Sequence, residues 1–256
     1  MGEMKKIAVL ILALLPLLAF VPERKALPEQ AKGETRYVMH YNRGSIRAKM
    51  ATATLMMDDG TWQEKPAYYA SFTVRAASIF KLFLLGEYKV RLFLSKDDMS
   101  PYYYSFPHKK KGKQRNLEFF YKEEVVESVL KQEDCPEPVR QTFPKEGKLT
   151  MEVASFALFL RCLDPASIRN EPLPVNLLMA SMSVPSELSY LGDDYSFWPG
   201  EAARHYKVKM LGRGLLENGS GDEIHIWVSP EPEHPMRGLE ILLGKGSVTA
   251  KMVVPE

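Results

Sequence analysis

The sequence predicts a mainly β protein, built as a single antiparallel curved sheet (a barrel or half-barrel) with one buried apolar helix. Three observations lead to this prediction. Apolar and polar residues alternate with period two over much of residues 34–254, which is typical of strands. Turn sequences rich in Gly, Asp and Asn separate the alternating runs. Residues 151–163 break this alternation and are apolar at nearly every position, as expected of a buried helix.

The first strands are expected within residues 37–42, 46–56, 67–76, 87–94, 102–106, 116–122 and 125–131. Three turn sequences separate several of them, at residues 42–45, 58–60 and 96–98. Residues 132–150 contain Pro136, Pro138, Pro144 and Gly147, so we expect them to form a loop.

The apolar helix over residues 151–163 is expected to begin after Thr150, which can cap it, and to end before Asp164-Pro165. It is too short to cross a bilayer. The last third of the chain returns to strands, at residues 174–183, 187–191, 204–211, 223–229, 237–242 and 247–254. Turns are expected at residues 192–194 and 218–221. From these thirteen runs we expect about eleven strands and one helix, without a repeat or an internal linker, which indicates one β-rich domain over residues 27–256.

The composition limits the classes of function. Of the 256 residues, 45% are hydrophobic and 26% are charged, which excludes a disordered chain, a collagen and a polytopic membrane protein. The formal net charge of +2 argues against a nucleic-acid partner, because such binders need a large basic surplus. The length suffices for a sizeable core.

The N-terminus has the plan of a secretory signal peptide. Lys5 and Lys6 precede a short apolar run over residues 7–21, whereas a buried core helix would not require a basic start. Cleavage could follow Ala26 or Ala19, and an uncleaved N-terminal anchor stays open. We therefore expect residues 1–26 to be a signal peptide and the protein to be exported to the periplasm. Removal of residues 1–26 would lower the net charge to zero, which leaves electrostatic recognition to local clusters.

The two cysteines, Cys135 and Cys162, have two interpretations. In an oxidising compartment they could form a disulfide that closes a loop of about 27 residues, worth ~3 kcal/mol. The alternative is two thiols, with Cys162 buried on the helix. Two cysteines are too few for a zinc site.

No motif of catalysis, metal binding or cofactor binding occurs. The adjacent acid pairs lie in turn-like settings, and the five histidines lack metal-ligand spacing. A nucleophile elbow, a phosphate-binding loop and a dinucleotide fingerprint are all absent from the sequence. We therefore predict no catalytic residues, no metal ligands, no cofactor and no enzymatic activity.

Two segments are candidates for interaction. A basic cluster comprises Lys109, Lys110, Lys111, Lys113 and Arg115. It either forms a solvated hairpin tip or contacts anionic groups of a membrane surface or cell-wall polymer. An apolar segment interrupts the strand pattern and comprises Ile79, Phe80, Leu82, Phe83, Leu84 and Leu85. It is either a core-packing turn or helix, or an apolar flap at the mouth of a cavity.

Three regions resemble one protein family. Residues 223–229 (EIHIWVS), Pro235-Met236-Arg237 and residues 242–250 (LLGKGSVTA) match the end of a bacterial domain-of-unknown-function family, number 3108. Residues 33–44 are similar to its opening, and residues 155–161 followed by Leu173-Pro174-Val175 are similar to its helix region. The resemblance spans roughly residues 33–254. It departs at residues 193–203, which are longer than the Gly-rich turn often found in the family.

The resemblance implies an exported, mainly antiparallel β protein of the Gram-negative cell envelope, and it implies no catalytic residue. A curved sheet covered by an apolar helix is also similar in plan to periplasmic lipoprotein carriers, although a fold alone does not fix a function. We expect a non-enzymatic periplasmic binding protein for an apolar or lipid-like ligand. The alternative is a structural or assembly factor for envelope proteins, which a fully packed interior would favour. An enzyme would instead need His, Asp and Glu side chains to converge in a cleft.

Overall fold

The computed structural model describes residues 32–77, 87–110, 113–179, 182–198, 200–211, 222–230, 236–243 and 246–253. Its strands in chain order are β1 (Gly33–Arg43), β2 (Ile46–Trp62), β3 (Lys65–Ala76), β4 (Glu87–Ser95), β5 (Pro101–Lys110), β6 (Lys113–Tyr121), β7 (Val125–Gln132), β8 (Cys135–Pro144), β9 (Leu149–Glu152), β10 (Leu173–Met179), β11 (Met182–Asp194), β12 (Ala203–Met210), β13 (Glu223–Val228), β14 (Met236–Leu243) and β15 (Gly246–Met252). Helix α2 (Val153–Phe159) and the 3-10 helix η4 (Pro165–Ile168) follow β9.

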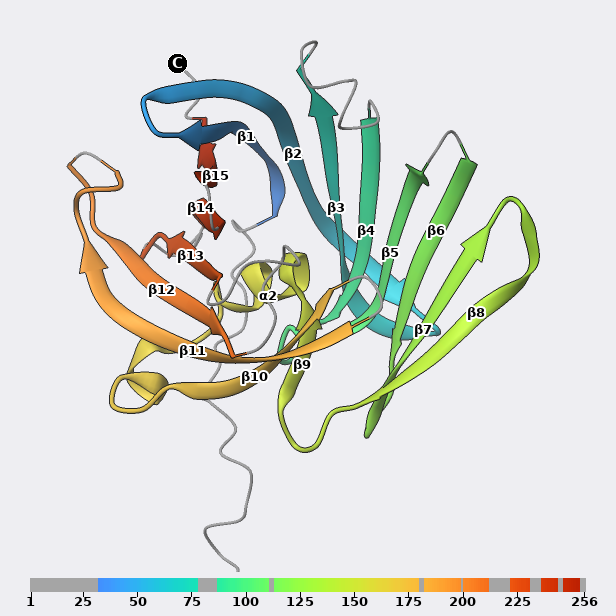
Figure 1. Cartoon of the computed structure of the whole chain (residues 1–256). Coiled ribbons are helices and arrows are strands. Elements are labelled where there is room, and N and C mark those ends of the chain that lie inside the picture. The colour runs from blue at the N-terminus through green and yellow to red at the C-terminus, as the bar shows by residue number, and fades with distance from the viewer. Residues whose placement is uncertain are drawn as a thin grey trace, which may run out of the picture.

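The fifteen described strands form one sheet, in the order β8-β7-β6-β5-β4-β3-β2-β1-β15-β14-β13-β12-β11-β10-β9. Strands adjacent in the chain are therefore adjacent in the sheet, except β8 and β9, which lie at its two opposite ends, and β1 pairs with β15 to join the two halves. These pairs are antiparallel, whereas β9 and β10 are parallel. The sheet ends at β8 and β9 without closing, and it curves around α2 (Figure 1).

This architecture confirms the predicted fold class, a mainly β protein with one curved sheet and one buried helix, and it is the open form of the two that were predicted. The prediction of about eleven strands was too low. Strand β8 and strand β9 both lie within residues 132–152, most of which were expected to form a loop. In the described ranges, no helix is long and apolar enough to cross a membrane.

Strand β8 shows why the loop prediction was wrong. It contains Pro136, Pro138 and Pro144, yet it pairs with β7 over most of its length. Proline has no N–H to donate to a neighbouring strand, so it is tolerated where one side of a strand faces solvent. Because β8 is an edge strand, it needs hydrogen bonds on one side only. The prolines are thus compatible with the edge of the sheet and also protect it from pairing with another chain.

The turn between β2 and β3 lies at residues 63–64, beyond its predicted position at residues 58–60. Asp58 and Asp59 remain in the strand, paired with Tyr69 and Tyr68 of β3. Asp59 also forms ion pairs with Lys32 and Lys96. The chain reverses instead at Gln63 and Glu64, where the backbone φ angles are 47° and 67°. Positive φ at both central residues is the geometry of a type I′ turn, which normally selects Asn-Gly.

Replacing Gln63 and Glu64 by Asn and Gly is therefore expected to stabilise the protein, by about 1 kcal/mol. Both new residues adopt positive φ at a lower steric cost than the native pair. Urea denaturation of the double variant should show a higher midpoint with an unchanged slope. The matched control is Gly44→Ala. Gly44 has a φ of 57° in the β1–β2 turn, so this substitution should lower the midpoint. An unchanged or lower midpoint for the double variant would contradict the assignment.

The apolar segment at residues 151–163 is buried, as predicted, but its helix is shorter and its cap differs. Residues 149–152 form β9, in which Thr150 and Met151 pair with Asn176 and Leu177 of β10. Helix α2 begins only after Glu152, whose Oε1 accepts a hydrogen bond of 2.9 Å from the Ser155 N–H. The predicted cap at Thr150 is therefore wrong, since the β9–β10 pairing already uses its backbone.

Two other predictions change in the second half of the chain. The strand predicted over residues 174–183 is divided, because β10 ends at Met179 and β11 begins at Met182. The turn predicted at residues 192–194 lies inside β11, where the pairing with β12 shifts by one residue between Tyr190 and Gly192. Such a bulge bends the strand without ending it.

The core lies between the concave face of the sheet and α2, which Figure 1 shows inside the curve. Its largest fully buried side chains are Tyr206, Phe119, Phe156, Phe159, Leu55, Met57, Leu92, Leu94, Met99, Leu158, Leu160 and Leu163. The strands supply these residues at alternate positions, which explains the period-two pattern in the sequence. The helix supplies them around its circumference, so it is apolar all round.

Candidate functional site

An apolar cavity of about 460 Å³ lies between the concave face of the sheet and the first turn of α2. Its volume falls in the range of pockets that hold small molecules. The described lining residues come from both halves of the sheet and from the helix, and they are Tyr37, Met39, Ala53, Phe72, Val74, Tyr88, Val90, Tyr104, Phe106, His108, Leu117, Phe119, Glu152, Val153, Ala154, Ala157, Leu178, Met179, Met236, Leu239 and Ala250.

Small side chains explain why this space is not filled. Ala53 on β2, Ala154 and Ala157 on α2, and Ala250 on β15 all line the cavity. Aromatic rings from β3, β4 and β5 also line it, namely Phe72, Tyr88, Tyr104 and Phe106. Interiors normally pack to the density of organic crystals, so a space of this size between large and small residues is unusual. The cavity is therefore a candidate binding site rather than ordinary packing.

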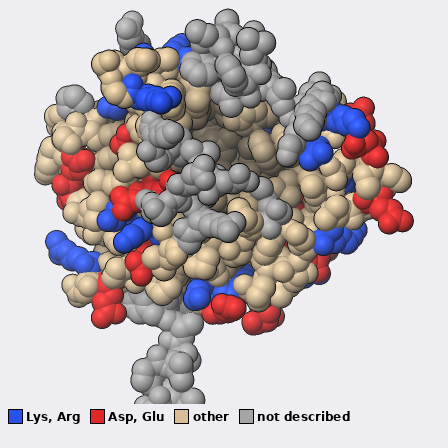
Figure 2. Space-filling view, viewed as in Figure 1, with Lys and Arg blue, Asp and Glu red and all other residues tan. Residues whose placement is uncertain are grey.

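Figure 2 shows this face of the molecule hollowed near its centre, and the visible atoms in the hollow belong to neither basic nor acidic residues. The composition of the lining agrees with the picture. Glu152 is the one carboxylate, and no lysine or arginine occurs, among the described residues that line the cavity. A ligand in this space would meet hydrocarbon and aromatic surface over almost all of its area.

Glu152 is the exception to this apolar lining, and only 3% of it is exposed. Its Oε1 accepts hydrogen bonds from the Ser155 N–H at 2.9 Å and from the Ser155 Oγ–H at 2.5 Å. Its Oε2 accepts from the Tyr121 hydroxyl at 3.3 Å, and that hydroxyl also accepts from the Glu152 N–H. The residue thus joins the end of β9, the first turn of α2 and the end of β6.

Burial raises the pKa of the Glu152 carboxyl to about 7, because desolvation of the charged form outweighs the hydrogen bonds that favour it. The neighbouring tyrosines are affected in the same way. Burial raises the pKa of Tyr121 and of Tyr104 well above the ordinary value, and the nearby Glu152 adds to both shifts. The carboxyl can therefore change its protonation near neutral pH, whereas the phenols stay protonated.

A second polar cluster lies on the outer face of the sheet, away from the cavity. His205 Nε2 on β12 and His225 Nδ1 on β13 are 2.8 Å apart, so one ring donates a hydrogen bond to the other. Burial and the neighbouring His225 lower the pKa of His205, which favours the neutral form of the His205 imidazole. His225 Nε2 also lies 3.4 Å from Glu223 Oε2, and Asp194 accepts a hydrogen bond from Trp227.

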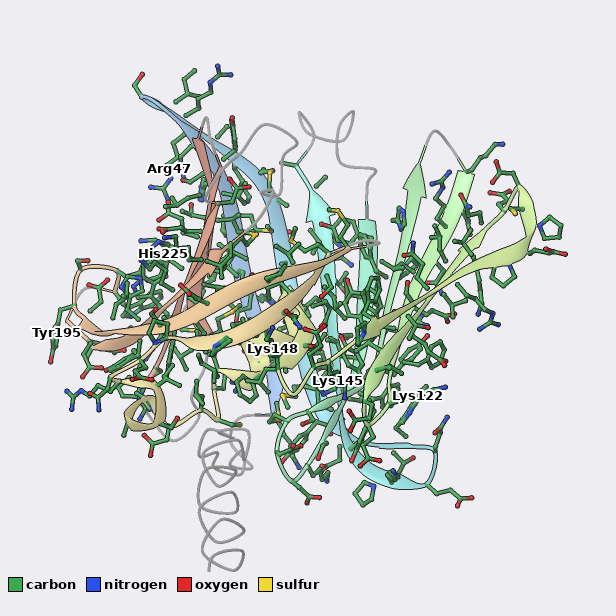
Figure 3. The ribbon with its side chains drawn as sticks, turned by 60° about the horizontal axis from the view of Figure 1, so that its bottom comes forward. Arg47, Lys122, Lys145, Lys148, Tyr195 and His225 are labelled. Carbon is green, nitrogen blue, oxygen red and sulfur yellow. The ribbon has the colours of Figure 1, made fainter. Side chains whose placement is uncertain are left out.

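The side chains of the outer cluster stack on one another and hold a loop against the sheet. The His205 and Trp227 rings stack at 4.5 Å, and Phe197 covers the other face of the same indole at 3.9 Å. These contacts fix residues 194–198 against β12 and β13. Figure 3 shows His225 among the strands on the left of its view, with Tyr195 at the outer limit of the same side. No group of three or more potential ligands with the arrangement of a metal site occurs in the described part of the chain.

The apolar flap predicted from Ile79, Phe80, Leu82, Phe83, Leu84 and Leu85 lies outside the described residues. It falls between β3 and β4, whose Val74 and Tyr88 line the cavity. Its role at the cavity mouth stays a prediction.

The basic cluster lies at a hairpin, as predicted. Lys109 and Lys110 end β5, and Lys113 and Arg115 lie on β6, whereas Lys111 is outside the described residues. The Lys113 Nζ is 2.6 Å from Asp134 Oδ2, and the Gln114 N–H donates to Glu133. These contacts bring two acids from the β7–β8 turn to the same place. The two acids lower the net positive charge of the basic cluster below what its sequence indicates. Contact of this cluster with an anionic surface stays a prediction.

Cys135 and Cys162 do not form the disulfide that was one of their two interpretations. Cys135 begins the edge strand β8 in the β7–β8 turn, and its Sγ contacts the Glu137 carbonyl at 3.1 Å. Cys162 is buried in the core after α2. The sheet thus places the two thiols in different environments, and the interpretation as two thiols agrees with the structure.

The cavity itself was not predicted residue by residue. Its described members come from ten strands and the helix, and no local motif connects them. Glu152 had one local signal, because it is the single acid at the start of an otherwise apolar run. An isolated acid in such a position indicates either a helix cap or a buried functional carboxyl, and the structure shows a cap that also lines the cavity.

Comparisons with known proteins agree with this fold. The family model of DUF3108, described as a protein of unknown function, matches residues 36–253. A crystal structure from Brucella abortus, described as a beta-barrel-like protein of the DUF1849 family, is 11% identical with a TM-score of 0.54. It covers 86% of this chain, and 95% of its own chain is matched, so the two share a fold.

A weaker likeness is found to LprF from Mycobacterium bovis, which is 12% identical and has a TM-score of 0.29. It covers 88% of this chain and 85% of its own, but the low score supports no inference. No curated protein matches the chain.

Proposed function

Because the chain belongs to the DUF3108 family of proteins of unknown function, we propose its function from its own cavity: a non-enzymatic protein that binds an apolar or lipid-like ligand. The N-terminal signal in the sequence supports export, so we propose the periplasm as its place of action.

The observation that supports this proposal is the cavity of about 460 Å³ with an almost entirely apolar lining. Transfer of an alkyl chain into such a space is favourable by about 0.8 kcal/mol for each buried methylene. A preformed cavity also lowers the entropic cost of binding, since the wall residues need not be reordered.

The cavity also bears on the two alternatives. A structural or assembly factor has no need of an internal space, and a fully packed interior would have favoured it. An enzyme needs converging polar groups in a cleft, whereas the His205–His225 cluster lies on the opposite face of the sheet from the cavity lining. Native mass spectrometry of protein purified from the periplasm distinguishes a ligand-binding protein from a structural or assembly factor, because a co-purifying lipid is expected only for the ligand-binding protein.

Substitution of Ala154 by Trp is expected to weaken binding of an uncharged apolar fluorophore, N-phenyl-1-naphthylamine, by about tenfold or more. Ala154 is half-buried on α2 and lines the cavity, so an indole there would occupy part of the ligand's space. Loss of burial for about two methylene equivalents corresponds to a tenfold change in affinity. Delipidated protein titrated with the fluorophore measures this effect.

The matched control is Ala48→Trp, since Ala48 is also half-buried but does not line the cavity. It should bind the fluorophore as the native protein does. Equal weakening in both variants would show that binding occurs elsewhere. Native protein that binds no better than an unrelated protein of the same net charge would contradict the proposed function as a whole.

A further inference from the structure

We propose that the cavity selects a ligand with a long apolar chain and a single uncharged hydrogen-bonding end group, such as an alcohol hydroxyl, and that this end group lies against Glu152. The inference rests on the proposed binding function and specifies its substrate class. It follows from the position of one carboxyl in an otherwise apolar space and from the absence of compensating charge around it.

The first step is the hydrogen-bonding capacity of Glu152. A carboxylate can accept about four hydrogen bonds. Ser155 supplies two donors to Oε1, and the Tyr121 hydroxyl supplies a longer contact of 3.3 Å to Oε2. Oε2 therefore retains capacity for a further partner. Because the residue lines the cavity, that partner can be the polar end of a bound molecule.

The second step concerns the charge of the end group. An ionised carboxylate or phosphate would lose its hydration in the cavity, and no lysine or arginine among the described lining residues could pair with it. It would also lie beside the acidic Glu152. A hydroxyl avoids this penalty, because it can donate to or accept from Glu152 in either protonation state.

A cationic amine is the other class to consider. It could pair with ionised Glu152, but that pair would sit among hydrocarbon and aromatic side chains, where desolvation of both ions opposes the attraction. The surroundings of Glu152 already disfavour its ionised form. The neutral form suits an uncharged partner, so the amine is the less favoured ligand.

The groups that face Glu152 determine how the affinity for a ligand should depend on pH. Its neighbours are Ser155 on α2, Tyr121 on β6, Tyr104 on β5 and Leu178 on β10, where Glu152 and Leu178 share a register position. Glu152 is the group of this set that titrates near neutral pH. A ligand that covers it removes further hydration and therefore favours its protonated form.

Linkage then sets the sign of the pH dependence. The complex binds a proton that the free protein loses as the pH rises through the pKa of Glu152. Affinity for a neutral ligand should therefore be highest at about pH 6 and should fall by up to tenfold for each unit above about pH 7. His108 also lines the cavity, so its contribution needs a control.

The experiment is displacement of N-phenyl-1-naphthylamine by dodecanol below its solubility limit, and by dodecanoate and dodecylamine below their critical micelle concentrations. At about pH 7, dodecanol should displace the fluorophore about tenfold better than either charged compound. Its affinity should fall as the pH is raised. In Glu152→Gln, which retains an amide in place of the neutral carboxyl, the affinity for dodecanol should not change with pH, and in His108→Gln the native pH dependence should remain.

The outcomes separate this inference from the proposed function. Binding of the fluorophore with equal displacement by all three compounds would overturn the inference and leave the binding function in place. Preference for dodecylamine, lost in Glu152→Gln, would also overturn it, because Glu152 would then be an ion-pair partner. Failure of the fluorophore to bind would contradict the binding function itself. The comparison of ligands on the native protein needs no variant, so it remains decisive even if Glu152→Gln unfolds.

Discussion

Raising the pH from about 5 to about 9 should remove about 3 kcal/mol of folding stability through Glu152 alone. The pKa of this buried carboxyl is raised from 4.5 to about 7 in the folded protein. Between these two values the native state holds a proton that the unfolded state has released. Stability from this group is therefore complete below about pH 4.5 and is lost as the pH rises through about 7.

The measurement is urea denaturation over this pH range for the native protein and for Glu152→Gln. The glutamine cannot ionise, and its side-chain oxygen can still accept from Ser155, so the variant should lose the downward slope. The difference between the two proteins is the informative quantity, because burial lowers the pKa of His40 and of His205 and these groups act with the opposite sign near pH 6. Parallel pH profiles would show that folding does not raise the pKa of the Glu152 carboxyl.

The second large effect is expected at Phe159. Its ring is fully buried in the core at the end of α2, with the Phe156 ring 6.2 Å away. Phe159→Ala removes most of the apolar surface that holds the helix to the sheet at this point. We expect a loss of about 3–5 kcal/mol in the free energy of unfolding, since such a cavity collapses only partly.

Tyr195→Ala is the matched control, because Tyr195 is 67% exposed and loses an aromatic ring without leaving a cavity. Its effect should stay within about 0.5 kcal/mol. The ratio of the two losses, from urea midpoints at constant slope, reports how firmly α2 is anchored. A small loss at Phe159 would indicate that the core can close around the gap, and the helix would then be a poor platform for Glu152.

Both predictions depend on how helix α2 is held against the sheet. Helix α2 is short, with seven residues, so it depends on tertiary packing rather than on its own propensity. Phe159 and its neighbours hold the helix inside the curve of the sheet, and the first turn of the helix presents Glu152 and Ala154 to the cavity. Stability of the helix and geometry of the site are therefore coupled.

The strand content could be predicted because its signal is local. Alternation of apolar and polar residues reports which face of a strand is buried, and it needs only neighbours along the chain. The same holds for the apolar run at residues 151–163, whose burial was predicted correctly. The family resemblance was also visible in short motifs, and the DUF3108 match over residues 36–253 confirms it.

The errors occurred where position in the sheet overrides local preference. Pro136 and Pro138 indicate a loop when read alone, but an edge strand accepts them. Asp58 and Asp59 indicate a turn, but pairing with β3 and ion pairs with Lys32 and Lys96 keep them extended. Gln63 and Glu64 adopt positive φ that neither residue prefers.

By itself, then, the sequence determined a curved β protein with a buried apolar helix, because these features follow from periodicity within short windows. The tertiary structure alone decided where the sheet stays open, where a cavity remains and which carboxyl faces it. Ala53, Ala154 and Ala250 are far apart in the chain and leave a space only when the curve of the sheet brings them around the same cavity. The pKa of Glu152 depends on the tertiary structure in the same way, since desolvation is a property of the whole environment rather than of the neighbouring residues in the chain.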